Sequence, residues 1–347
     1  MKFLSGSKKE FLDFLEGISQ KDRVAILSHN DLDGIASAVF LEEILKSKGI
    51  RHSLKKFLDY KNGMFMEITH ELDKKNINKI FILDIAADQT DSKGFEKLRK
   101  KFDVFLIDHH PMNPRLRNKQ RILKTESSDC ASFIIYELGD NLFDRKKWAW
   151  LISSAMISDM SYKKRENLEF IKRLCPDITS KDIFDSYPGK IENIISFALI
   201  YYKSKNLNLN KVYLKIKNKK IRELSRYSGV IKKEINKNLS NFRKKSEFYP
   251  EKKIYFFTFN SKFDIGAILS TLISLEDDKG IFIITRNSGE FITIHARNQS
   301  KNEDMGKLLK KGIEGLKNSN AGGHAAAAGG RIMKKDFKKF KENILNF

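Results

Sequence analysis

Aspartate and histidine side chains gather at three places where a short apolar run ends. The runs cover residues 24–27, 81–83 and 104–107, and each is typical of a buried parallel strand. The polar groups after them are His29-Asn30-Asp31-Leu32-Asp33-Gly34, Asp84 and Asp108-His109-His110. Carboxylates and imidazoles together suit Mn²⁺, Mg²⁺, Fe²⁺ or Zn²⁺. Metal-dependent chemistry is therefore the first hypothesis.

The elements around these clusters are expected to bring them to one edge of a sheet. Helical patterns lie between the strands, near residues 65–75 and 92–102. Strands that alternate with helices predict an α/β fold with a doubly wound parallel sheet, covered by helices on both faces. Ligands of such sheets bind beyond the carboxyl ends of the strands. Because crowded buried carboxylates repel one another, cations among them would resolve the conflict.

Each cluster also has a plainer explanation when it is taken alone. The Asp31–Gly34 run could be a helix-capping turn, Asp84 could be structural, and the Asp108–His110 run could lie on a surface loop. The arrival of all three at strand ends favours metal binding. Cys130 and Cys175 have no zinc-binding spacing, so a structural zinc is disfavoured and both thiols are predicted to be reduced.

Length and charge narrow the class of protein. A chain of 347 residues has room for two domains, and a net charge of +22 predicts a polyanionic partner, either nucleic acid or an anionic membrane. An AT-rich genome accounts for a share of the lysine excess. No apolar run approaches the roughly 18 residues that span a bilayer, and the N-terminus turns polar after Leu4. We therefore expect a cytoplasmic protein with no membrane partner.

Half of the net charge comes from residues 205–250, which hold 14 Lys or Arg, three Glu and no Asp. This segment predicts a basic connector between an N-terminal domain of residues 1–204 and a smaller α/β domain of residues 251–347. Basic residues can follow a phosphate backbone while aromatic rings stack on unpaired bases. The aromatic residues of the connector are Tyr213, Tyr227, Phe242, Phe248 and Tyr249. A solvated helical linker is the alternative.

The last hundred residues carry candidate phosphate contacts. A strand at 254–257, a helix at 265–275 and a hairpin around Asn287-Ser288-Gly289 precede a run rich in glycine and alanine, residues 321–329. Glycine lets backbone N–H groups approach an anion, so Gly322 and Gly323 are candidates, together with the side chain of His324. Arg297 is a further candidate because arginine grips phosphate with two N–H groups. A flexible low-complexity loop and a surface arginine without a role are the alternatives.

These motifs together resemble those of the DHH phosphoesterase superfamily. The resemblance rests on His29-x-Asp31-x-Asp33-Gly34, on Asp84, on Asp108-His109-His110, on Asp159 after a helix, and on Gly322-Gly323-His324. The last of these looks like the signature of the DHH-associated substrate domain, although Ala321 stands where a third glycine is usual. Residues 28–34 look most like those of archaeal RecJ-like nucleases.

The resemblance implies a site for two divalent ions, Mn²⁺ first and Mg²⁺ as the alternative, in a cleft between two lobes. His29, Asp31 and Asp84 would hold one ion, and Asp33, Asp84, His109 and Asp159 the other. His110 would lie near the scissile phosphate, and Asp108 would orient a ligand imidazole.

The implied activity is that of an exonuclease for single-stranded DNA or RNA, which could also dock on replication or repair proteins. One alternative is a phosphodiesterase for short oligoribonucleotides, cyclic dinucleotides or 3′-phosphorylated nucleotides. Another is a replication or repair scaffold related to helicase partners.

Overall fold

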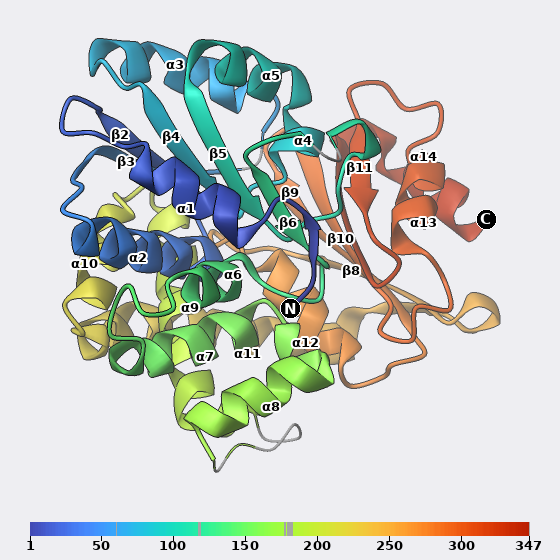
Figure 1. Ribbon diagram of the computed structural model, residues 1–347. Coiled ribbons are helices and arrows are strands. Elements are labelled where there is room, and N and C mark those ends of the chain that lie inside the picture. The colour runs from blue at the N-terminus through green and yellow to red at the C-terminus, as the bar shows by residue number, and fades with distance from the viewer. Residues whose placement is uncertain (60, 117–118, 177, 179–182, 347) are drawn as a thin grey trace. The chain divides into compact units, whose positions relative to one another are not determined.

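The computed structural model describes residues 1–59, 61–116, 119–176, 178 and 183–346. The chain divides into two compact units (Figure 1). The N-terminal unit comprises residues 1–199 and 208–228, and the C-terminal unit comprises residues 200–207 and 229–347. Each unit contains a six-stranded sheet. No helix of the described chain is long and apolar enough to cross a membrane.

The N-terminal sheet has the strand order β1-β6-β5-β4-β2-β3. Its strands are β1 (Phe3–Ser5), β2 (Val24–His29), β3 (His52–Leu58), β4 (Lys79–Leu83), β5 (Asp103–Asp108) and β6 (Ile122–Thr125). All neighbours are parallel except β1, which runs antiparallel to β6. The predicted strands β2, β4 and β5 lie side by side, which confirms the parallel core. The sequence did not indicate β3, because this edge strand alternates polar and apolar residues only weakly.

Helices cover both faces of this sheet because its central strands are apolar on both sides. Ile80 and Ile82 of β4 pack with α3 (Met64–Lys74) and α5 (Ser92–Lys101). Phe81, between them, contacts Phe11 and Phe14 of α1 (Lys8–Glu16) on the opposite face. Figure 1 shows α3 and α5 on one side of the strands and α1 and α2 (Leu32–Ser47) on the other.

Further helices follow the sheet in the chain. They are α6 (Ala131–Leu138), α7 (Ala149–Ser158), α8 (Arg165–Leu174) and α9 (Tyr187–Ser204); a short α4 (Ala87–Thr90) precedes them. The predicted connector is also helical, with α10 (Asn210–Lys217) and α11 (Ser225–Lys245). The basic segment is therefore divided between the two compact units and includes a helix of 21 residues.

The C-terminal sheet has the strand order β11-β12-β10-β9-β8-β7. Its strands are β7 (Glu247–Tyr249), β8 (Ile254–Phe259), β9 (Ile281–Ser288), β10 (Phe291–Arg297), β11 (Asn320–Gly323) and β12 (Ala327–Met333); its helices are α12 (Gly266–Ser274), α13 (Met305–Gly312) and α14 (Phe337–Leu345). The predicted hairpin is confirmed, with Gly289 at a φ of 63° in its turn. Alternation along β10 sends Ile292, Ile294 and Ala296 into the core with α13 and α14.

Candidate metal centre and substrate contacts

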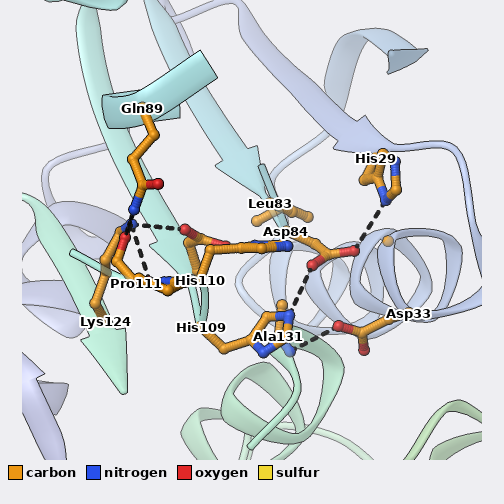
Figure 2. A network of polar contacts seen from close by, with 12 residues as sticks. His29, Asp33, Leu83, Asp84, Gln89, His109, His110, Pro111, Lys124 and Ala131 are labelled. Carbon is orange, nitrogen blue, oxygen red and sulfur yellow. Dashed lines mark hydrogen bonds and ion pairs between the residues drawn. The ribbon is translucent and has the colours of Figure 1, made fainter. Parts of the chain in front are cut away.

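Three neighbouring strand ends deliver their polar side chains to one place, as Figure 2 shows. His29 ends β2, Asp84 follows β4, and His109 follows β5. The Nδ1 atom of His29 lies 2.9 Å from Asp31 Oδ2 and 3.5 Å from Asp84 Oδ2. The other oxygen of Asp84 lies 3.3 Å from His109 Nε2. Asp84 therefore stands between the two histidines.

The side chains form two sets whose ligand atoms lie within 4.8 Å of one another. One set is His29, Asp31 and Asp84; the other is Asp33, His109 and Asp159. The first set is one that the family resemblance implies; the second lacks the Asp84 of its implied set, although Asp84 Oδ1 lies 3.3 Å from His109 Nε2. A further grouping joins Asp84 and His109 to Asp108 and His110. The donor set has carboxylates and imidazoles without a thiolate, which fits Mn²⁺ or Mg²⁺.

The backbone around His29 and Asp31 explains the local sequence. Asp31 caps α2, because its Oδ1 accepts a hydrogen bond from the Gly34 N–H at 2.9 Å. The helix-capping role of Asp31 is thus confirmed: Oδ1 caps the helix, while Oδ2 lies 2.9 Å from His29 Nδ1. A Cβ atom at Gly34 would lie 2.3 Å from the His29 carbonyl oxygen, so the close turn requires glycine.

Asp84 has a left-handed backbone, with a φ of 56°. This conformation is uncommon for residues other than glycine, although aspartate tolerates it better than most. Such residues concentrate at functional sites, where the surrounding structure holds them in place. Here the Asp84 N–H donates to the Ile107 carbonyl at 3.0 Å, so the turn is tied to the neighbouring strand.

The electrostatics of the site show how strongly its carboxylates compete. Burial and the neighbouring Asp84 raise the pKa of Asp33 to about 7, although the N–H groups of Ala131 and Ser132 donate to it at 2.8 and 2.9 Å. Burial, together with Asp33 and Asp84, raises the pKa of Asp159 well above its usual range. Burial opposes protonation of His29, but Asp31 and Asp84 raise its pKa to about 10. Bound protons reduce the repulsion among these carboxylates, and bound metal cations would reduce it in the same way.

Sequence reasoning missed two residues behind this site. Lys124 of β6 has no exposed side-chain surface, and its Nζ lies 2.7 Å from Asp88 Oδ1 and 2.8 Å from Asp108 Oδ2. The other oxygen of Asp108 lies 2.7 Å from His110 Nδ1. Asp108 thus orients His110. The family resemblance implied instead that Asp108 would orient an imidazole that binds a metal ion. In the sequence, this network is indicated only by the lysine at position 124, which interrupts the apolar run of β6.

The C-terminal candidates lie near one end of their sheet. Arg297 of β10 is opposite Ala327 of β12, which follows the turn that contains His324. Gly322 and Gly323 are exposed strand residues, and a Cβ atom at Gly323 would lie 2.4 Å from the Ala327 oxygen. The Nε atom of Arg297 lies 3.5 Å from Ser270 Oγ, and burial lowers the pKa of its guanidinium. Among the described residues no carboxylate is within ion-pair distance of Arg297, which suits it to an anion.

Comparisons with known proteins agree with this arrangement. Residues 23–159 match the N-terminal domain of the DHH family, and residues 253–347 match the DHHA1 domain. The two matches together cover more than half of the chain, which therefore belongs to the DHH superfamily and has the fold of DHH phosphoesterases. No curated protein gives a significant sequence match.

Solved structures share the fold at low sequence identity. Exonuclease RecJ bound to manganese has a TM-score of 0.72 at 14% identity, over 98% of this chain and 94% of that chain. RecJ from Thermus thermophilus in complex with Mn²⁺ has a TM-score of 0.68 at 13% identity, over 97% of this chain but 53% of its own. An exopolyphosphatase-related protein from Bacteroides fragilis has a TM-score of 0.62 at 17% identity, over 98% and 95%.

Proposed function

We propose that this protein is a metal-dependent phosphodiesterase that shortens single-stranded DNA or RNA from an end. The observation that carries the proposal is the position of Asp84 between two ligand sets, within reach of His29 on one side and His109 on the other. His29, Asp31 and Asp84 would hold one ion, and Asp33, Asp84, His109 and Asp159 the second. Two divalent ions held there, Mn²⁺ in the first instance, would clamp a phosphate and supply a water with a pKa near neutrality.

His110 is the residue of this site that we assign to the substrate rather than to an ion. Asp108 engages its Nδ1 atom, so we assign the contact with the scissile phosphate to Nε2. Asp108 is fully buried and Lys124 holds its second oxygen, so the imidazole has a defined orientation. Burial would raise the pKa of Asp108, but His110 and Lys124 hold it well below its usual range. Asp108 therefore remains an acceptor for His110.

The C-terminal unit would bind the rest of the substrate. The Arg297 guanidinium, the backbone of Gly322 and Gly323, and the His324 side chain offer donors for phosphate oxygens. The net charge of +22 favours a polyanion over a small nucleotide. The similarity in length to an exonuclease RecJ chain supports the same substrate class.

A phosphodiesterase for short nucleotides is the second candidate. It is favoured by one observation: a solved pGpG-specific phosphodiesterase from Vibrio cholerae has a TM-score of 0.50 at 12% identity, and this chain covers 97% of its length. The two candidates predict different length preferences. The nuclease should degrade long strands efficiently, whereas the rival should act on dinucleotides and stall on strands of twenty nucleotides.

The deciding experiment is digestion of end-labelled DNA and RNA of graded length, from two to about forty nucleotides, with Mn²⁺, Mg²⁺ or excess chelator. We expect a ladder of products that shortens from one end, and no products in chelator. Cleavage of dinucleotides alone would replace the nuclease with its rival. A complete lack of hydrolysis with either metal would favour the scaffold.

A further inference from the structure

The structure divides the basic residues of the connector into two groups. Lys215 and Lys217 of α10 form ion pairs with Glu223 and Glu42, so they serve the N-terminal unit. The exposed lysines of α11 form no ion pair within the described chain; they are Lys232, Lys233, Lys237, Lys244 and Lys245. The one acidic residue of α11 is Glu234. A lysine without a carboxylate partner keeps its full charge for another ligand.

Three of these lysines form a row along one face of α11, all within the C-terminal unit. Lys233, Lys237 and Lys244 are separated by four and seven residues, which places them one above another on a helix. At about 1.5 Å per residue the row is about 17 Å long. The opposite face is buried through Ile235 and Phe242. The lysine row therefore points away from the sheet on which the helix packs.

A stack of aromatic rings begins three residues after this helix ends. Phe248 of β7 is opposite Tyr255 of β8, and Tyr255 is opposite Phe282 of β9. The rings of Phe248 and Tyr255 are stacked with centroids 4.3 Å apart, and those of Tyr255 and Phe282 with centroids 5.0 Å apart. Phe282 is 2% exposed but Phe248 is 48% exposed. The stack therefore has a buried end and an open end.

The lysine row and the ring stack belong to one packed piece. Phe242 of α11 contacts both Tyr255 and Phe282, with centroids 6.0 and 6.1 Å apart. The helix is thus anchored on the buried part of the stack, and its last turn leads to the exposed ring of Phe248. A flexible linker would have no such fixed relation between its charges and its rings.

We propose that the lysine row and Phe248 form a second contact surface for the single strand, built from residues of the C-terminal unit and using none of the metal ligands. The lysines would contact successive phosphates, and one unpaired base would stack on Phe248. The combination of unpaired cations with an exposed ring favours a single strand, because a duplex offers no unpaired base. This inference rests on the proposed function, since it requires a substrate longer than a dinucleotide.

The test is binding of a fluorescent twenty-nucleotide strand in chelator across a salt series, so that hydrolysis does not contribute. The triple variant Lys233→Glu, Lys237→Glu, Lys244→Glu should weaken binding at least tenfold. It should also reduce the log–log salt slope by about 2, because each lost phosphate contact removes about 0.7 for a single strand. The matched control carries Lys93→Glu, Lys97→Glu and Lys100→Glu, three exposed lysines on α5. The control should bind nearly as the wild type does.

Phe248→Ala should weaken binding about tenfold without changing the salt slope, and Phe248→Trp should restore it, because a ring supplies the contact. Dinucleotide hydrolysis should stay unchanged in every variant. Wild-type binding in both the triple variant and Phe248→Ala would overturn this surface while leaving the nuclease intact. A wild-type protein that neither binds nor degrades the strand would overturn the proposed function itself. Conversion of a dimer to a monomer by Phe248→Ala would assign the ring to self-association and overturn the proposal.

Discussion

Several charged side chains at the candidate metal centre of the N-terminal unit are withdrawn from solvent, whereas three of the candidate substrate contacts in the C-terminal unit are exposed. Asp33, Asp84, Asp108 and Lys124 are each at most 1% exposed. Gly322, Gly323 and His324 are exposed. Burial makes each charge in the first unit dependent on its partners, because an uncompensated buried charge is costly. The first unit should therefore respond to a single substitution far more strongly than the second.

The largest effect is expected at Asp84, which we propose as a ligand of both ions. Asp84→Ala should lower hydrolysis at least about a thousandfold, the scale on which removal of a central electrostatic group acts. The metal-free protein should stay folded, because loss of one carboxylate relieves repulsion with Asp33 and offsets the strain of a left-handed alanine. Hydrolysis, metal content and thermal unfolding in chelator measure this. Robust activity of the variant would contradict the shared-ligand assignment.

Substitution of Lys124 tests the cost of an unpaired buried charge and leaves every proposed metal ligand in place. Lys124→Met should lower the free energy of unfolding by about 3–5 kcal/mol, because Asp88 and Asp108 would lose their common cation. The control is Lys101→Met, whose ion pair with Asp73 is about half exposed and should contribute at most about 1 kcal/mol. Urea unfolding of both variants gives the comparison. Equal losses would show that burial does not distinguish the two pairs.

Glu192 of α9 offers a test of burial through pH. Burial raises its pKa from 4.5 to about 7, although Ser196 and Ser158 oppose the shift. The folded protein then holds this proton more tightly than the unfolded chain, so stability falls as pH rises from about 4.5 to 7. Glu192→Gln cannot ionise and should become more stable than the wild type above pH 7, by at most about 3 kcal/mol.

Chemical unfolding of both proteins from pH 4 to 8 in chelator measures this difference. All other titrating groups are the same in the wild type and in Glu192→Gln, so their contributions to the difference in stability largely cancel. A difference in stability that stays constant over this range would show that Glu192 is not protonated in the folded protein.

The smallest effect is expected at His324 in the C-terminal unit. His324→Ala should reduce hydrolysis about tenfold, the size expected when one hydrogen bond to a charged group is lost, and leave the metal content and the unfolding midpoint unchanged. His70→Ala, which removes an exposed histidine from α3, is the matched control and should keep full activity. Loss of metal from the His324 variant would mean that the two units do not divide metal binding from substrate binding in this way.

The residues of the candidate metal centre could be chosen from the sequence because parallel strands impose a simple rule. Strands β2, β4 and β5 are apolar runs, their carboxyl ends meet at one edge, and the ligand residues follow directly. Asp159 required the family motif, because no strand precedes it. Local patterns likewise sufficed for the β9–β10 hairpin.

Only the tertiary structure decided which charged side chains and aromatic rings are buried and which are exposed to a ligand. Lys124 and Lys233 are both lysines, yet the first is buried between two aspartates and the second is exposed. Tyr213 and Phe248 are both aromatic residues of the basic connector, yet one is 1% exposed and the other 48%. Neither difference depends on local spacing, because burial is set by partners that lie far away in the chain. Residue type and spacing therefore indicated the candidate metal ligands, and packing determined which other side chains are buried behind them or exposed to a substrate.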